Sequence, residues 1–413
     1  MRVVVQKFGG TLLRSREGRE RVARHVLRTR RCGHRVVVVA SAIGRAGEPY
    51  ATDTLLRLAK EIHPEVDART LDLLLSCGEV ISCALLSHLL CSLGQPAVAL
   101  TGAQAGILTT RRFGDARILR IRPTRVLRAL EAGRVPVVAG FQGVTAGGEV
   151  TTLGRGGSDV TAVALGVAVR ADVVELYKDV DGVMTCDPAI VPEARRIPRI
   201  GYDEVAQMAY LGARVIHPRA VDVGREHGVR IVVRRLGAEG GTEIVVGPAV
   251  DQPIHDGRTV IGLAHLADLA QIRVRLDPGA DQRDALEALR AVAGAGISID
   301  LINLSPDLLA FTVRLEEGAR AEQALRDAGL PAERREPCAK VSVVGAGIRG
   351  VPGVMLRVVR ALREERIPVL QTADSHTTIS CLVPREQMEA ALRALHREFQ
   401  LAEGVESVRE AYV

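Results

Sequence analysis

The chain is 413 residues long and contains no tryptophan, five phenylalanines and five tyrosines. Few aromatic rings are therefore available to stack on bases. The 55 basic residues are interleaved with 49 acidic ones, which gives a net charge of +6 without a long basic run. Proteins that bind single-stranded nucleic acid usually combine a basic groove with stacking aromatics, so we expect no nucleic-acid partner.

The chain has few cysteines, and their spacing does not match that of metal ligands. The seven cysteines are odd in number and scattered, with no C-x-x-C pair and no nearby cluster with histidine. This spacing argues against a disulfide framework and against the usual zinc sites, so we predict reduced thiols and no metal held by protein ligands alone. The apolar run from Val3 to Val5 is too short for a secretion signal. We therefore expect a cytoplasmic protein.

The sequence also lacks an uninterrupted apolar segment of membrane-spanning length. The stretch that comes nearest, Leu71 to Leu93, is interrupted by Asp72, Glu79 and His88. Charged side chains are costly in hydrocarbon, so this stretch predicts a core helix and no membrane partner. Glu79 must then be either paired inside a site or exposed on a polar stripe, and we favour pairing.

Lysine is the scarcest charged residue, because it occurs only at positions 7, 60, 178 and 340 among 55 basic residues. Arginine is used almost everywhere else. A lysine retained in such a chain indicates a task that needs a compact ammonium group rather than a planar guanidinium.

Residues 1–248 alternate short β-like runs with helical patterns. Such alternation predicts an α/β domain with a mainly parallel sheet between helices, in which ligands bind at the carboxyl ends of the strands. Strands are expected at residues 3–6, 35–40, 97–100, 135–139, 173–177 and 229–233, and helices at residues 17–31, 71–93, 123–132 and 159–169.

A linker rich in proline and glycine near residue 250 leads into a repeat with an offset of 70 residues. Residues 271–276 fall on residues 341–346, and residues 309–313 fall on residues 379–383. Each unit reads strand, helix, strand, strand, helix. We therefore expect two tandem α+β modules, residues 260–336 and 337–413, which can pair edge to edge in a larger sheet. The last strand of the second module is a candidate to complete the first.

Two glycine-rich segments carry candidate chemistry. Lys7-Phe-Gly-Gly-Thr11 follows the first strand, where glycines let a backbone approach a ligand and the lysine adds charge, so the segment looks like a phosphate cradle. Its alternative is a tight turn with a solvated lysine. The second segment, residues 153–162, feeds a helix that Ser158 can cap, with Arg155 and Asp159 at its start. It can hold an acid or a phosphate, although the helix dipole alone would explain Asp159.

Of two further patterns, one is a candidate ligand contact and the other is not. Tyr177-Lys178-Asp179 ends a strand and offers polar contacts to a ligand, with a solvated turn as the alternative. The segment from Gly345 to Gly350 fits a dinucleotide fingerprint, but too few residues follow it for a dinucleotide-binding domain. We therefore do not expect a nicotinamide cofactor.

Taken together, the motifs resemble those of a known family. They occur in the order seen in aspartate kinases, and the resemblance covers essentially the whole chain, because that family follows an amino acid kinase domain with two regulatory ACT domains. The stretch from Ser41 to Thr54 looks most like the diaminopimelate-sensitive, single-function bacterial type, aspartokinase I. The motifs are residues 7–11, Ser41-Ala-Ile-Gly with Thr52-Asp53, Gly78-Glu79, residues 101–106, 154–159, 179–183, 186–188 and 212–218.

The resemblance implies ATP-dependent phosphorylation of the aspartate side-chain carboxylate to 4-phospho-L-aspartate. This is the first step of lysine, diaminopimelate, threonine and methionine biosynthesis. It implies ATP with Mg²⁺ as cofactor, with the metal held chiefly by the phosphates. Three residues would be catalytic, namely Lys7, Asp159 and Arg214. The nucleotide and its phosphates would contact Lys7, Gly9, Gly10, Thr11, Lys178, Asp179, Met184, Asp187 and Arg214, and aspartate would contact Ser41, Thr52, Glu79 and Arg155.

Regulation is implied in the same way. Feedback inhibition by lysine or meso-diaminopimelate would act through the ACT modules of a homodimer or higher homo-oligomer, at an effector site that includes Asp277, Asp300 and Gln371. Asp300 is expected to follow a strand and to receive the ammonium group of the effector.

The chain departs from the family pattern at a few positions, and two alternatives stay open. Arg214, Leu12, Met184 and Ala189 stand where the family commonly has lysine, serine, tyrosine and arginine. One alternative is another amino acid kinase, such as a glutamate or acetylglutamate kinase. The other is a catalytically inactive amino-acid sensor.

Overall fold

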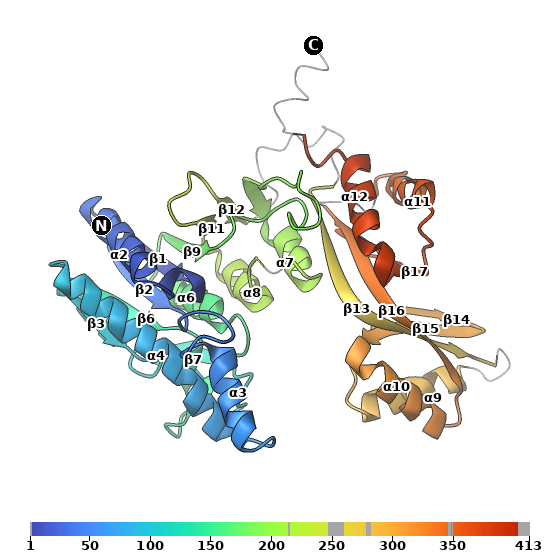
Figure 1. Ribbon diagram of the computed structural model, residues 1–413, viewed down its shortest axis with the longest axis horizontal. Coiled ribbons are helices and arrows are strands. Elements are labelled where there is room, and N and C mark those ends of the chain that lie inside the picture. The colour runs from blue at the N-terminus through green and yellow to red at the C-terminus, as the bar shows by residue number, and fades with distance from the viewer. Residues whose placement is uncertain are drawn as a thin grey trace, which may run out of the picture. The chain divides into compact units, whose positions relative to one another are not determined.

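The structure is a computed structural model that describes residues 2–213, 215–246, 260–277, 282–345, 348 and 350–403 (Figure 1). The chain divides into two compact units. The first unit comprises Met1–Val183, Arg196–Ala209 and Arg214–Asp251, and the second comprises Met184–Arg195, Tyr210–Ala213 and Gln252–Val413.

In the described part of the first unit, an eight-stranded sheet has the order β10-β12-β11-β9-β1-β2-β6-β3. Neighbouring strands run parallel except for β11 and β12, which are antiparallel. The expected mainly parallel sheet is confirmed. These strands are β1 (Val3–Phe8), β2 (Arg35–Ala40), β3 (Ala97–Leu100), β6 (Val135–Ala139), β9 (Val173–Lys178), β10 (Arg199–Gly201), β11 (Ile231–Arg235) and β12 (Thr242–Val245).

Helices cover the sheet because its central strands are apolar on both faces. Side chains of α2 and α4 form one core with Phe8 of β1 and with alternate residues of β2 and β6, while α6 packs against β1, β2 and β9. The helices up to residue 227 are α1 (Gly10–Leu13), α2 (Arg16–Arg31), α3 (Thr52–Ile62), α4 (Ala68–Ser92), α5 (Thr124–Glu131), α6 (Gly157–Ala168), α7 (Tyr202–Tyr210) and α8 (Pro218–His227).

Helix α4 is long and apolar enough, by length and composition, to cross a membrane. Half of its most apolar 18-residue window is buried inside the structure, and α4 packs against β3, β6 and β8. Asp72 and Glu79 lie on its buried side. A core helix with these contacts passes the same composition test, which agrees with the sequence interpretation.

A second, smaller sheet was not expected from the sequence. Within the described residues it has four short strands in the order β5-β4-β7-β8. They are β4 (Ile107–Thr109), β5 (Ile118–Ile121), β7 (Gln142–Val144) and β8 (Val150–Thr152). Strand β8 leads directly into the glycine loop before α6, so this sheet places that loop.

The second unit contains both repeats in one antiparallel sheet. Among its described residues, six strands have the order β14-β15-β13-β16-β18-β17. The long strands β13 and β16 pair with each other in the centre, so the expected edge-to-edge pairing is confirmed. The elements are β13 (Gly262–Arg275), α9 (Arg283–Gly294), β14 (Asp300–Ser305), β15 (Leu308–Arg314), α10 (Leu315–Asp327), β16 (Ala332–Val344), α11 (Val354–Glu364), β17 (Gln371–Asp374), β18 (Thr378–Pro384), a 3-10 turn (Arg385–Gln387) and α12 (Met388–Glu398).

Two details differ from the expectations. Asp300 is the first residue of β14 rather than a residue that follows a strand, because residues 297–299, between the turn after α9 and β14, form no regular secondary structure. The expected boundary between residues 336 and 337 falls inside β16, whose first half pairs with residues 271–274 and whose second half pairs with residues 262–266. The domain boundaries at 248, 260 and 336 therefore stay predictions, and residues 404–413 lie outside the described residues.

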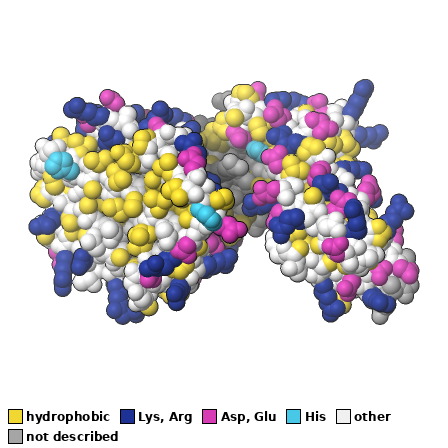
Figure 2. All heavy atoms as spheres, turned by 60° about the horizontal axis from the view of Figure 1, so that its bottom comes forward, with side chains coloured by type: hydrophobic (Ala, Val, Ile, Leu, Met, Phe, Trp, Pro, Cys, Tyr) yellow, Lys and Arg dark blue, Asp and Glu magenta, His cyan; other side chains and the backbone are white. Residues whose placement is uncertain are grey.

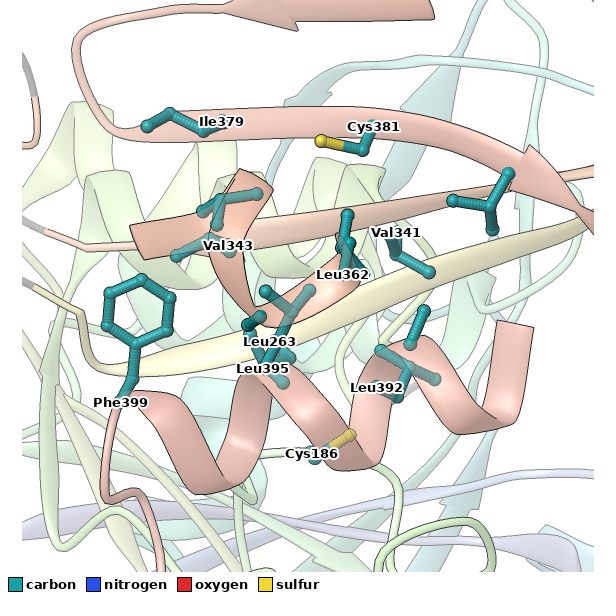
Figure 3. Close-up of a cluster of buried hydrophobic side chains, with 14 of the residues drawn as sticks. Cys186, Leu263, Val341, Val343, Leu362, Ile379, Cys381, Leu392, Leu395 and Phe399 are labelled. Atoms are coloured by element: carbon teal, nitrogen blue, oxygen red, sulfur yellow. The ribbon is translucent and has the colours of Figure 1, made fainter. Parts of the chain in front are cut away.

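The core of the second unit includes a segment from far earlier in the chain. Cys186, Ile190 and Val191 are buried among side chains of β13, β16, α11 and α12. Figure 3 shows Cys186 against α12, near Leu392 and Leu395. The segment 184–195 is thus packed as part of the second unit.

Candidate active site

The sheet of the first unit has a topological switch point between β1 and β9. The chain leaves β1 towards β2 on one side, and it leaves β9 towards β11 on the other. Ligands of open α/β sheets bind at the carboxyl ends of the strands at such a point. Lys7 is the penultimate residue of β1 and Lys178 is the last residue of β9, so the two lysines stand where a ligand is expected.

A single buried carboxylate holds both lysines. The Nζ atom of Lys7 lies 2.8 Å from Oδ1 of Asp159, and the Nζ atom of Lys178 lies 2.6 Å from Oδ2. Asp159 is in the first turn of α6 and is 2% exposed. Burial alone would raise its pKa, but the ammonium groups of Lys178 and Lys7 hold the pKa well below its usual value.

Lys7 is almost as deeply buried, at 5% exposed. The pKa of its ammonium group is lowered to about 8, chiefly by burial; the charge of Asp159 opposes this shift and the charge of Lys178 adds to it. Two ammonium groups on one carboxylate leave a net positive charge in a water-poor place. Such a place favours a bound anion.

The glycines after β1 allow three chain segments to meet. Gly9 donates its N–H to the Tyr177 carbonyl at 3.3 Å, and Gly44 donates to the Gly10 carbonyl at 3.0 Å. A Cβ atom on Gly10 would lie 2.3 Å from the Ala42 oxygen, so only glycine fits there. Gly10 and Thr11 begin the short helix α1, which follows Gly9.

The glycine loop before α6 is built differently from the expectation. The cap residue of α6 is Gly156, which has φ of +73°, and Ser158 lies inside the helix without capping it. A serine side chain is not needed here because glycine supplies the left-handed turn. A Cβ atom on Gly156 would also lie 2.4 Å from the ring of His217.

Glu79 is buried, and its carboxylate contacts another segment of the first unit. Its Oε1 accepts a hydrogen bond from the backbone N–H of Ala42 at 3.1 Å, next to Ser41. Within the described residues its Oε2 is buried and has no hydrogen-bond partner. Burial raises the pKa of Glu79 to about 8, against the smaller opposing effects of backbone N–H groups and Lys7.

The other residues assigned to aspartate lie at the starts of helices and in loops. Ser41 directly follows β2, and Thr52 is the first residue of α3. The side chain of Arg155 is 87% exposed and forms an ion pair of 3.1 Å with Asp53, which follows Thr52. The structure thus joins Arg155 to the Thr52 region and Glu79 to the Ser41 region.

Residues assigned to the nucleotide fall in both units. Asp179 follows Lys178 in the first unit and pairs with Arg45 at 2.5 Å. Met184 and Asp187 belong to the second unit; Met184 is half-buried, and Oδ1 of Asp187 accepts from the Ala189 N–H at 2.9 Å. Arg214 lies outside the described residues.

The residues assigned to the effector are only partly together. Asp300 forms an ion pair with Lys340, and Gln371 donates to the Leu301 and Ala310 carbonyls and accepts from Gln271. Asp277 instead lines a cavity of about 340 Å³ to which neither Asp300 nor Gln371 contributes.

Three residues near the site were missed or misread in the sequence. Asp72 was read only as a charge that interrupts an apolar stretch, yet it accepts hydrogen bonds from the Gly114 and Thr152 N–H groups at 3.0 and 2.7 Å and fixes the chain beside β8. His217 caps α8 with its ring against Gly156. Arg45 pairs with Asp179. Only His217 had a local signal, because it precedes the proline that opens α8.

Comparison with known proteins shows similarity along nearly the whole chain. The model of the amino acid kinase family matches residues 2–235, and an ACT domain model matches residues 333–397. Aspartokinase 1 of Bacillus subtilis is 43% identical over 97% of this chain and 100% of its own length. The aspartokinase of Corynebacterium glutamicum is 39% identical over 99% and 98%.

The chain belongs to the aspartokinase family. Among solved structures, E. coli aspartokinase III in complex with aspartate and ADP, in its R-state, matches with a TM-score of 0.80 and 26% identity, over 96% of this chain and 99% of that one. The same enzyme in complex with lysine and aspartate, in its T-state, matches with a TM-score of 0.74 and 25% identity over the same shares.

Proposed function

We infer that the protein is an aspartate kinase that transfers the γ-phosphoryl group of ATP to the side-chain carboxylate of L-aspartate. The reaction gives 4-phospho-L-aspartate and ADP, and it opens the biosynthesis of diaminopimelate, lysine, threonine and methionine. Membership of the aspartokinase family supports this activity. The observation that carries the mechanism is the pair of lysines on Asp159 at the switch point.

The chemistry requires positioning and charge rather than a base. An aspartate carboxylate is already ionised at neutral pH, so one of its oxygens can attack the γ-phosphorus directly while the bond to the β-phosphate oxygen of ADP breaks. Lys7 and Lys178 supply positive charge where the phosphoryl oxygens gather negative charge. Asp159 holds both ammonium groups in place and compensates part of their charge.

The aspartate half of the site is proposed to lie around Ser41, Thr52, Glu79 and Arg155. The unpartnered Oε2 of Glu79 is an acceptor that an α-ammonium group would satisfy. The guanidinium of Arg155 matches an α-carboxylate and is exposed enough to reach one. The side-chain carboxylate would then point to the lysines.

The phosphates of the nucleotide are proposed to contact Lys7, Gly9, Gly10, Thr11 and Arg214. The rest of the nucleotide is proposed to lie against Lys178, Asp179, Met184 and Asp187. Among the residues that the structure describes, no group of three or more His, Cys, Asp or Glu side chains is placed to hold a metal ion. Both Asp159 oxygens already face lysines. We therefore propose that Mg²⁺ binds chiefly through the phosphates of ATP.

We further propose feedback regulation by a basic amino acid, lysine or meso-diaminopimelate, at the ACT repeats. The cavity beside Asp277 has a counterpart of about 260 Å³ in the second repeat, where Asp374 and Ser375 correspond to Leu304 and Ser305. Exposed Ile302 and Leu304 lie on β14, which is an edge strand of the sheet. An apolar edge of this kind supports a homodimer through the ACT repeats. A cytoplasmic location stays a prediction.

The test is aspartate-dependent release of ADP by the full chain with ATP and Mg²⁺. Glutamate and acetylglutamate in place of aspartate address the other amino acid kinases. We expect release with aspartate only, inhibition by lysine or diaminopimelate, and loss of release in Lys7→Met. Aspartate binding without release in the unaltered chain would indicate the inactive sensor instead.

A further inference from the structure

Residues 183–197 form a hairpin-shaped loop whose two arms are joined by backbone hydrogen bonds. Ile197 donates to the Val183 carbonyl at 2.8 Å, and Thr185 donates to the Arg195 carbonyl at 2.7 Å. Residues 184–195 belong to the second unit. Most of this hairpin therefore belongs to the second unit, although it follows β9 closely in the chain.

The anchoring of this segment in the ACT unit is extensive. The backbone N–H of Leu263 donates to the Thr185 carbonyl at 2.7 Å, and Nε of Arg393 donates to the Ile190 carbonyl at 3.1 Å. Cys186 is 3% exposed and lies against α12 (Figure 3). These contacts come from β13 and α12, so the conformation of residues 184–191 depends on ACT elements.

One polar contact in this packing is buried and specific. Nε2 of His396, on α12, lies 3.1 Å from Oγ1 of Thr185, and His396 is 2% exposed. The same Thr185 oxygen accepts the N–H of Arg195 at 3.0 Å. The histidine ring therefore completes the hydrogen bonding of a hydroxyl that also links Thr185 to Arg195 on the other arm of the hairpin. Thr185 lies between Met184 and Asp187 in the chain.

We propose that His396 is a positioning residue for ATP, which acts through Thr185 to hold Met184 and Asp187 in the conformation that binds the nucleotide. The proposal rests on the assignment of Met184 and Asp187 to the nucleotide in the proposed function. Loss of the ring removes the partner of a buried hydroxyl, so residues 184–187 rearrange. Nucleotide binding then weakens, while the aspartate half of the site keeps its residues.

The test compares steady-state KM values for ATP and aspartate in full-length variants. His396→Leu should raise the KM for ATP at least fivefold and leave the KM for aspartate within twofold. His396→Gln places an amide near the position of Nε2 and should restore the KM for ATP to within twofold. Ser380→Ala is the matched control, because it removes a buried 2.8 Å hydrogen bond that Ser380 shares with Ser342 on the neighbouring strand of the ACT sheet rather than with Thr185. It should leave both KM values unchanged.

Two further variants keep the outcomes distinct. Thr185→Val should reproduce the effect of His396→Leu, and Thr185→Ser should not, which provides the test if His396→Leu fails to fold. Asp187→Ala checks the underlying assignment. If Asp187→Ala raises the KM for ATP but His396→Leu and Thr185→Val do not, the positioning role is wrong and the proposed nucleotide site stands. If Asp187→Ala has no effect on ATP, the nucleotide assignment itself fails. Equal rises in both KM values would show a general structural role and overturn the proposal.

Discussion

Aspartate binding should release a proton from Glu79. The pKa of Glu79 is raised to about 8 by burial, and its Oε2 has no partner within the described residues. In the free protein at pH 7 the carboxyl is therefore protonated in about nine molecules out of ten. If Oε2 receives the α-ammonium group of aspartate, binding requires the ionised form, and the proton must leave.

The magnitude follows from the difference between the pH and this pKa. We expect about 0.9 proton released per bound aspartate at pH 7 and about 0.5 at pH 8. The dissociation constant for aspartate should rise roughly ninefold between pH 7 and pH 6, because almost every free molecule must then be deprotonated before it binds. Above pH 9 the effect should disappear.

Isothermal titration of aspartate in two buffers with different ionisation enthalpies measures the released protons directly. The control is Glu79→Gln, which keeps the size of the side chain and cannot ionise. It should bind aspartate weakly, with no proton release and no pH dependence between pH 6 and pH 8. Release below 0.2 proton at pH 7, or equal release by the variant, would refute the pairing of Glu79 with the substrate.

The same variant also tests stability. Because the folded-state pKa of Glu79 lies above its usual 4.5, the native state binds more protons than the unfolded state between these values. The contribution of this group to stability therefore falls as the pH rises from 4.5 to 8. Glu79→Gln should unfold at a higher temperature than the wild type at pH 8, and this difference should shrink at pH 5. A lower melting temperature at pH 8 would contradict the buried, unpaired state of Oε2.

Other substitutions test the proposed phosphoryl-transfer site, the aspartate site and the effector site. Lys7→Met should lower kcat by about 10² to 10³ with little change in the KM for aspartate, because it removes one charge contact to the transferring group; Lys7→Arg should not rescue it, and a loss below fivefold in steady-state assays would exclude this role. Arg155→Ala should raise the KM for aspartate and leave the KM for ATP unchanged, since its guanidinium is the proposed partner of the α-carboxylate. A large loss of ATP affinity alone would instead assign Arg155 to the nucleotide site. Asp300→Ala should abolish inhibition by lysine or diaminopimelate with uninhibited kcat within about threefold, but it leaves Lys340, which is 4% exposed, without its partner. Lys340→Met frees Asp300 instead and should lower the half-inhibition concentration, so unchanged inhibition curves in both variants would place the effector elsewhere.

The sequence predicted those elements whose local pattern agrees with their final environment. Strands β1 and β2 are β-branched runs that become buried on both sides, and the 70-residue repeat indicated the shared sheet of the ACT unit. The small sheet was missed because its strands have three or four residues, too few to show a period. Residues 262–266 of β13 were missed because their described strand pairing is with β16 of the other repeat, whereas residues 269–275 also pair with β15 of their own repeat.

For the site, the sequence indicated which residue types matter but not which atoms meet. Lys7, Asp159 and Lys178 were each suggested by a separate motif, and only the fold shows that one carboxylate binds both ammonium groups. The serine at position 158 suited a helix cap by type, yet the left-handed turn at Gly156 took that place. The sequence did not predict that residues 184–195 pack into the ACT core, because Cys186, Ile190 and Val191 form no helical or strand period that would indicate a buried face.

This arrangement gives a physical reason why positions 7 and 178 carry lysine in a chain that otherwise mostly uses arginine. A guanidinium tends to bind both oxygens of a carboxylate as a planar fork, and one such fork on Asp159 would leave no oxygen for a second cation. An ammonium group is compact and needs only one oxygen, so Lys7 takes Oδ1 and Lys178 takes Oδ2. The result is a buried site with two positive charges and one negative charge, and its surplus charge is available to a phosphoryl group. Arginine, which the chain uses for nearly all other cations, cannot build that site around a single aspartate.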